Sequence, residues 1–260
     1  MISRARMHGW LESFEVYKNP KVIALLFLGF SAGLPILLVF GTLSAWLNSE
    51  QIDKTTFGFV SWVALAYGLQ FVWSPLVDRL ALPFLTPLLG QRRSWMLLAQ
   101  FGVITGLVMM AAYNPHDSLT LVVSFAVLTA FSSATQDIAI DAWRIEAIDD
   151  EYQGAMAGTY QLGYRIGMII AGSMAFVIAD FYSWHVAYIC MAAFMSVGVI
   201  STFIISEPDH TLSNNEWATE KRVLSLLARN QHLPEQIRRL QAWFVGAVIC
   251  PFADFFARNK

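Results

Sequence analysis

Long apolar stretches recur along the 260-residue chain and constrain its fold more than any other feature. A helix needs about 20 consecutive apolar residues to cross the hydrocarbon core of a bilayer. Six stretches meet this requirement, and each is bounded by a short polar break. They lie at residues 22–47, 57–77, 94–113, 119–143, 153–179 and 184–205. The sequence therefore predicts an all-α membrane protein with six transmembrane helices in one bundle, residues 22–205.

The composition excludes several classes of protein. Hydrophobic residues make up 56% of the chain and charged residues 14%, whereas soluble domains carry about 25% charged residues. A formal net charge of −2 gives no support to binding of nucleic acid, so we expect no such partner. Cys190 and Cys250 lie in apolar runs without a CxxC or Cys/His cluster, which indicates neither disulfides nor a metal site. No cofactor is expected.

The basic residues predict the orientation of the chain, because Lys and Arg collect in cytoplasmic loops of membrane proteins. One set of connecting segments holds most of them: Arg4, Arg6, Lys18, Lys21, Arg79, Arg92, Arg93, Arg144, Lys221, Arg222, Arg229, Arg238 and Arg239. The three loops on the opposite side hold only Lys54. We therefore expect residues 1–21 to form a cytoplasmic N-terminal segment and the chain after residue 205 to be cytoplasmic too.

The region after the sixth stretch differs from the bundle. Residues 206–240 are polar, with two amphipathic patterns typical of helices that lie on a membrane surface. The apolar run 242–250 is too short to span, and Pro251 leads into "FADFFARNK". We expect that the sequence is cut off and that residues 241–260 begin a further membrane unit.

The fourth stretch contains "FSSATQDIAIDAWR" (131–144), an unusually polar sequence for a membrane helix. Asp137 and Asp141 are four residues apart, so both lie on one helix face, and Arg144 can reach the same face. An ionised aspartate costs about 2.5–3.5 kcal/mol at the bilayer centre, so it faces protein or a water-filled cavity. A carboxyl group that exchanges a proton as water comes and goes is what a proton-coupled carrier needs. Asp137 and Asp141 are candidate coupling residues.

A structural role is the alternative for this group. Asp141 and Arg144 can belong to a charge cluster at the cytoplasmic end of the bundle. The other basic residues available to such a cluster are Arg79, Arg92 and Arg93. Asp137 lies deeper in the predicted span and is harder to explain as scaffolding.

Arg165, in "TYQLGYRIGMIIAG", lies inside the fifth stretch and also needs a partner. Asp137 and a substrate carboxylate or phosphate are equally good candidates for that partner. The same stretch contains two glycine pairs with small-xxx-small spacing, Gly154/Gly158 and Gly163/Gly167. This spacing favours close packing between helices.

Several residues within the predicted spans could line a cavity, because they are polar or allow a helix to bend. They are Gly33, Pro35, Tyr67, Gln70, Gln136, Tyr160 and Gln161. Pro35 removes a backbone hydrogen bond from the first span and permits a bend there. Ordinary helix packing also tolerates such residues, so both interpretations stay open.

The loop after the second stretch, "SPLVDRLALPFLTPLLGQRRSWML", resembles the loop between spans two and three of major facilitator transporters, G-x-x-x-D-R-x-G-R-R in outline. The matching residues are Asp78, Arg79, Gly90, Arg92 and Arg93. Ser74 or Pro75 stands where a glycine is usual, and a longer run separates the DR pair from the GxRR. The resemblance implies that this loop, with Arg144 beside it, forms charge contacts that stabilise one of the alternating-access states.

Three further fragments resemble the AmpG-type muropeptide permeases: "GFSAGLP" (29–35), "SATQDIAIDAWR" (133–144) and "PFADFFARN" (251–259). These permeases import anhydromuropeptides across the bacterial inner membrane for cell-wall recycling and for signalling that induces β-lactamase. Paired aspartates of that family match Asp137 and Asp141, and the family's transport is thought to depend on the proton gradient. The resemblance implies a sugar-peptide substrate, protons as coupling ions and the lipid bilayer as surroundings.

The resemblance also implies a fold of two six-helix halves, each built from two inverted three-helix repeats, with the substrate between the halves. This chain would supply the N-terminal half and the connecting segment, and its partner would be a missing C-terminal half. Two alternatives remain: a related facilitator that carries a drug, siderophore or acyl compound, and a half-length membrane protein without transport activity.

A membrane enzyme is a third class to weigh. Aspartyl proteases need two carboxylates that face each other and share a proton, whereas both aspartates here lie on one helix and no GxGD occurs. No HExxH is present either. We therefore expect no catalytic residues and no enzyme.

Overall fold

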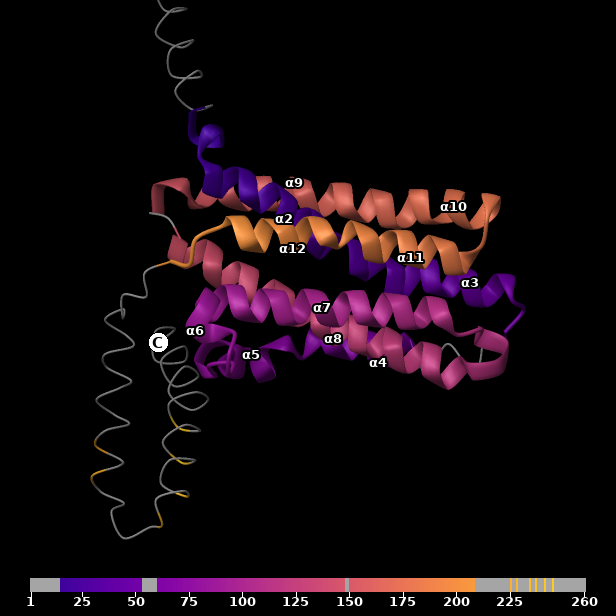
Figure 1. Cartoon of the computed structure of the whole chain (residues 1–260), viewed down its shortest axis with the longest axis horizontal. Helices are drawn as coiled ribbons and strands as arrows, with labels where there is room; N and C mark the ends of the chain where they lie inside the picture. Colours follow the sequence, from indigo (N-terminus) through magenta and orange to yellow (C-terminus); the bar gives the residue numbers. More distant parts are fainter. Residues whose placement is uncertain are drawn as a thin grey trace, which may run out of the picture.

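The computed structural model describes residues 15–52, 60–147 and 150–208, together with single positions between 225 and 245. Within these ranges every regular element is helical, in agreement with the all-α prediction. The long helices lie side by side along one direction (Figure 1). The predicted interfacial helices of the 206–240 linker, the segment 241–260 and most of residues 1–21 fall outside the described residues, so those boundaries stay predictions.

Among the described residues, five helices are long and apolar enough to cross a membrane. The first combines α2 (Pro20–Leu37), the π-helical segment η2 (Leu38–Thr42) and α3 (Leu43–Ser49). The next two are α7 (Gln91–Ala112) and α8 (Pro115–Ala147). The fourth combines α9 (Gln153–Ile169), the π-helical segment η5 (Ile170–Met174) and α10 (Ala175–Phe181). The fifth combines α11 (Trp184–Phe194) and α12 (Ser196–Ile204).

The second expected span differs from the others. It is described only from Val60 and forms two short helices, α4 (Val60–Gly68) and α5 (Gln70–Arg79), with a break at Leu69. Neither piece is long enough to cross a membrane by itself. Six spans and a cytoplasmic N-terminus therefore stay predictions.

Short elements complete the described chain. A turn of 3-10 helix, η1 (Val16–Lys18), precedes α2, and another, η4 (Asp150–Tyr152), precedes α9. The loop after α5 contains the short helix α6 (Thr86–Leu89) and ends at Gly90, whose φ of 88° favours glycine. The α2 start follows from Asn19, whose side chain accepts a hydrogen bond from the Lys21 amide, and from Pro20 at the first helical position.

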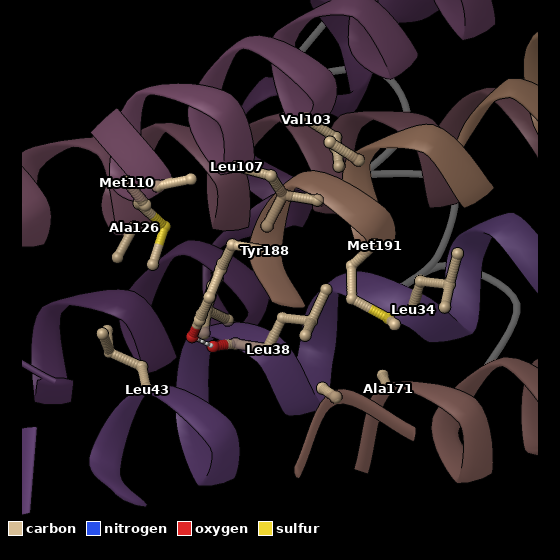
Figure 2. Packing of buried hydrophobic residues seen from close by; sticks show 14 of the residues in the cluster. Leu34, Leu38, Leu43, Val103, Leu107, Met110, Ala126, Ala171, Tyr188 and Met191 are labelled. Atoms are coloured by element: carbon tan, nitrogen blue, oxygen red, sulfur yellow. Dashed lines mark hydrogen bonds between the residues drawn. The ribbon is translucent and has the colours of Figure 1, made fainter. Parts of the chain in front are cut away.

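Two apolar clusters fill the interior. One surrounds Trp46, Leu107 and Tyr188, and the other surrounds Trp95 and Trp143. Figure 2 shows the first cluster, where Tyr188 inserts between α2, η2 and α7. Its buried hydroxyl donates to the Leu38 carbonyl oxygen at 2.7 Å.

The two π-helical segments lie against each other and are joined by the Thr42 hydroxyl. The Thr42 hydroxyl in η2 donates to the Ala171 carbonyl oxygen in η5 at 3.1 Å. The Tyr188 hydroxyl of α11 donates to the Leu38 carbonyl oxygen in η2. A π turn disturbs the regular hydrogen bonding of a helix, and a buried carbonyl needs a donor. The expected irregularity in the first helix is therefore present, since η2 begins three residues after the buried Pro35.

α2 and α9 form the most extensive helix pair. Gly29 and Gly33 on α2 lie against the backbone carbonyls of Tyr160 and Tyr164, so that an added Cβ would overlap those carbonyls. Gly163 and Gly167 on α9 lie in the same way against the backbone of Leu26 and Phe30 on α2. Backbones approach this closely only where side chains are small.

This interface changes the interpretation of three glycines. Gly33, a candidate for cavity lining, is buried between two helix backbones, which leaves it no cavity to face. The packing expected for Gly163/Gly167 is observed. The same expectation was wrong for Gly154 and Gly158, because a Cβ added at either would meet nothing within 4 Å in the described part of the chain.

Candidate functional site

Asp137 lies on the side of α8 that faces α9 and is half-buried. The Tyr160 hydroxyl of α9 donates a hydrogen bond to Asp137 Oδ1 at 3.2 Å. Asp141, one helical turn further on, forms an ion pair with Arg144 at 3.2 Å, and half of the Asp141 side chain (52%) is exposed. The two aspartates thus have different surroundings: Asp137 has a tyrosine from another helix, and Asp141 has an arginine from its own.

Arg165 is exposed on α9, and no ion pair joins it to Asp137 in the described part of the chain. Of the two partners considered for Arg165, the structure thus leaves the substrate anion as the prediction. Gln161, a candidate cavity residue one turn before Arg165, is exposed too. Both side chains are therefore accessible on a part of α9 that also carries the open Gly158.

Gln136 is buried in the centre of the bundle. Its Nε2 donates to Ser31 Oγ at 3.0 Å, and the Ser31 hydroxyl in turn donates to the Leu28 carbonyl oxygen. The Ser31 hydroxyl hydrogen is already donated to the Leu28 carbonyl, so Ser31 can only accept from Gln136. The Gln136 amide must therefore present its NH₂ group to Ser31. The Gln136 Oε1 atom is left buried without a hydrogen-bond partner.

The remaining cavity candidates lie on α4 and α5, across from α8. Tyr67 packs its ring on Phe40, and its buried hydroxyl lies within interaction range of the Ser133 hydroxyl on α8. Gln70 is half-buried at the start of α5. A hydroxyl both donates and accepts, so Tyr67 and Ser133 are the polar pair that connects α4 with α8.

A group of charged residues gathers at one end of the bundle, where α5, α8 and α12 finish and α7 begins. We call it the charged end: Asp78, Arg92, Arg93, Glu146 and Glu207. Arg92 is its centre, with a side chain only 9% exposed. Its guanidinium contacts Glu146 of α8 through Nε at 3.0 Å and through Nη2 at 2.5 Å, and its Nη1 contacts Asp78 at 2.7 Å. A fork-shaped donor suits two carboxylates at once.

Glu207 and Arg93 connect α7 to the end of α12. The Glu207 carboxylate accepts hydrogen bonds from the backbone amides of Arg92 at 2.7 Å and of Arg93 at 3.1 Å. These amides belong to the first turn of α7, where a negative charge is favourable. The Arg93 guanidinium donates to the carbonyl oxygens of Thr202 and Phe203 in the last turn of α12. Gly90 is needed here also because a Cβ would overlap Glu207.

The loop residues predicted from the sequence do not all join this network. Asp78, Gly90, Arg92 and Arg93 come together, whereas Arg79 is exposed and forms no ion pair within the described ranges. Arg144 pairs with Asp141 instead of with the loop. The charge cluster that was the structural alternative for Asp141 therefore contains Arg144 and not Arg79, Arg92 or Arg93.

Sequence reasoning missed Glu146 and Glu207. Both were visible as acidic residues just beyond the fourth and sixth apolar stretches, on the side where the basic residues collect. A buried arginine needs such partners, which could have directed attention to them. The described residues contain no group of three or more His, Cys, Asp or Glu side chains that could hold a metal ion.

Comparison with known proteins identifies the class. The sequence profile of the Major Facilitator Superfamily matches residues 13–257. The chain therefore belongs to the Major Facilitator Superfamily, as the loop motif predicted.

Individual relatives show which members of the superfamily the chain resembles. The chain is 36% identical over 247 residues to the anhydromuropeptide permease of Escherichia coli (strain K12), which covers 95% of this chain and 44% of the permease. It is 34% identical to the putative transporter AmpG 4 of Rickettsia felis, with 94% of this chain and 54% of that protein covered. The predicted resemblance to AmpG-type permeases is confirmed. The chain spans about half the length of the curated relatives that it matches.

Proposed function

We propose that this chain is the N-terminal part of a secondary active transporter that imports anhydromuropeptides across the bacterial inner membrane, coupled to protons. The observation that carries this proposal is the 36% identity over 95% of the chain to a protein named anhydromuropeptide permease. The complete carrier would include a second six-helix half, and its N-terminus would be cytoplasmic.

The substrate class is supported by the chemistry of the bundle. Anhydromuropeptides are sugar-peptides with many hydroxyl and amide groups. Gln136 Oε1 is buried without a hydrogen-bond partner in the described part of the chain. Such atoms favour a polar ligand or water over an apolar one, because an unpaired buried polar atom costs free energy.

Proton coupling is supported by the position of Asp137. It is half-buried in an apolar bundle, and its polar neighbour is an uncharged tyrosine. A carboxyl group without a cationic partner in such a place can gain or lose its proton as water reaches it. Asp141 has Arg144 beside it, so Asp137 is the better candidate for the coupling carboxylate.

The experiment that tests this function uses the protein expressed from its complete coding sequence. Uptake of labelled anhydromuropeptide is followed in membrane vesicles with and without an imposed pH gradient. Wild type should accumulate substrate only with the gradient. Asp137→Asn should lose that accumulation at matched expression, because an amide side chain cannot take up and release a proton.

Asp141→Asn is the matched control, since it makes the same change one turn away at an ion-paired carboxylate. We expect it to keep gradient-driven accumulation. Normal accumulation by Asp137→Asn would remove Asp137 from the coupling mechanism. Failure of wild type to take up muropeptide, with uptake of a drug, siderophore or acyl compound instead, would refute the substrate assignment.

A further inference from the structure

The hydrogen bond between Tyr160 and Asp137 joins α8 and α9 away from their connected ends, where Gln153 donates to the carbonyl oxygens of Arg144 and Ile145. α8 and α9 make few contacts with each other in the described residues, whereas α9 packs along α2 and α8 along α7. The Tyr160 hydroxyl crosses from α9 and donates to Asp137 Oδ1 at 3.2 Å. A change in this bond therefore affects how the two helices are held together.

The backbone of Tyr160 is held against α2. The backbone carbonyl of Tyr160 lies directly against Gly29, and Gly163, nearly one turn further along α9, lies against the Leu26 carbonyl. The Tyr160 ring also contacts the ring of Tyr164, with 6.1 Å between centroids. The hydroxyl is thus held in front of Asp137 by a rigid helix pair to which Asp137 does not belong.

We propose that Tyr160 is the positioning residue for Asp137: its hydroxyl holds the ionised carboxylate at the α8–α9 contact and sets the pH at which Asp137 takes up a proton. This inference rests on the proposed function and assigns Tyr160 a role beyond lining a cavity. The ionised carboxylate is a pure acceptor for the phenol O–H. A hydrogen bond to a charged acceptor is about twice as strong as one between neutral groups. Protonation of Asp137 therefore weakens the link between α8 and α9.

Other groups face Asp137 and must be considered with it. Asp141 lies one turn away on α8, Tyr67 lies within electrostatic range on α4, and Tyr164 does so on α9. Asp141 is a like charge, but its ion pair with an arginine reduces its effect. The two tyrosines are neutral, and no hydrogen bond joins either to Asp137 in the described residues. Tyr160 is thus the group whose removal should change Asp137 directly.

The first readout is the pH dependence of muropeptide uptake in proteoliposomes containing the complete protein. Tyr160→Phe keeps the ring and the backbone contact with Gly29 and removes only the hydroxyl. Because the hydroxyl stabilises the ionised carboxylate, its loss should move the midpoint of the pH profile to higher pH, by about one unit or less. Tyr164→Phe removes a neighbouring hydroxyl that does not bond to Asp137, and its midpoint should stay at the wild-type value.

The second readout does not depend on transport. Infrared difference spectra between high and low pH contain the C=O stretch of each carboxyl group that takes up a proton, and the band absent from Asp137→Asn belongs to Asp137. Tyr160→Phe should shift the frequency of this band and its titration midpoint, and Tyr164→Phe should not. The thermal unfolding temperature of each variant, measured alongside, identifies any variant that misfolds.

The outcomes separate the two proposals. An unchanged Asp137 band and an unchanged uptake profile in Tyr160→Phe would overturn the positioning role while leaving Asp137-dependent transport intact. Equal shifts in Tyr164→Phe would overturn it as well, because the effect would not belong to the hydrogen bond. A shifted band in a protein that does not transport muropeptide would support the role of Tyr160 and refute the proposed substrate.

Discussion

The helix pairs α2–α9 and α7–α8 are the two most extensive in the bundle. They differ in the kind of atom that meets the interface glycines, backbone in the first pair and side chain in the second. In α2–α9, glycines on each helix meet the backbone of the other, as Gly29 does at Tyr160 and Gly163 does at Leu26. At these glycine positions neither helix has a side chain that could move aside. The spacing of these two helices is therefore set by the backbones themselves.

In α7–α8 the atoms nearest to the interface glycines of α7 belong to side chains. Gly102 and Gly106 of α7 face the hydroxyl-bearing side chains of Ser132 and Thr129 on α8. At one end of the pair, the Arg92 guanidinium binds the Glu146 carboxylate. Side chains have alternative rotamers and can lose a partner without separating the backbones. We infer that α2–α9 is the rigid pair of the bundle and α7–α8 the adaptable one.

The largest expected effect follows from Gly163→Ala, which tests the rigid pair. The new methyl group would overlap the Leu26 carbonyl oxygen, and the helices can relieve the overlap only by moving apart. We expect a loss of about 3 kcal/mol or more in the free energy of unfolding. Thermal unfolding of the purified protein in detergent measures this as a lower midpoint.

Gly158→Ala is the matched control on the same helix. A methyl group there meets nothing within 4 Å in the described ranges, and alanine is a better helix former than glycine by about 1 kcal/mol. Its unfolding midpoint should equal or exceed that of wild type. If both variants lost stability equally, the effect would come from helix propensity or lipid contact, and the idea of a rigid α2–α9 pair would fail.

The next effect in size belongs to Arg92→Met, which tests the charged end of the adaptable pair. Methionine keeps much of the side-chain length but leaves Glu146 and Asp78 without their cation. Breaking a fully buried pair costs about 3–5 kcal/mol. Glu146 and Asp78 are 24% and 43% exposed, so water compensates in part and we expect a loss of about 2 kcal/mol.

A surface pair provides the control for Arg92. Lys18 lies 3.6 Å from Glu15, and both side chains are more than two thirds exposed, at 77% and 71%. Lys18→Met should leave the unfolding midpoint of the protein unchanged. An equal loss in both variants would mean that net charge, and not the Arg92 contacts, stabilises this end.

The sequence predicted the helical class well because the bilayer imposes a length on apolar segments that is visible in hydropathy alone. It did not predict the break at Leu69, although Gly68 and Gln70 flank it, because single glycines are common inside membrane helices. The same limit applies to the glycines of α9. Gly154/Gly158 and Gly163/Gly167 have identical spacing, but only the second pair meets α2. The spacing of small residues predicts a flat helix face, but it does not predict which helix packs against that face.

Contacts of the candidate site between residues of one helix were predictable from the sequence, whereas contacts between helices were not. Asp137 and Asp141 share a face because of helix geometry, and Arg144 reaches Asp141 for the same reason. The contact of Asp137 with Tyr160 depends on where α2 places α9, and no local pattern contains that information. Glu207 at the start of α7 was hidden for a similar reason, because its partners are more than a hundred residues earlier in the chain.

The smallest effect is expected from Gly102→Ala, which tests whether the α7–α8 pair can accommodate an added methyl group. The added methyl group would meet the Ser132 hydroxyl oxygen and, less closely, the Ser132 Cβ atom. The oxygen can turn to another rotamer and the Cβ contact needs only a small shift, so we expect a loss of about 1 kcal/mol. Removing the oxygen should relieve the closer of the two contacts. Gly102→Ala combined with Ser132→Ala should therefore be more stable than the sum of the two single changes, a coupling measurable in a double-mutant cycle. Strict additivity, or a loss as large as that of Gly163→Ala, would mean that α7–α8 is as rigid as α2–α9.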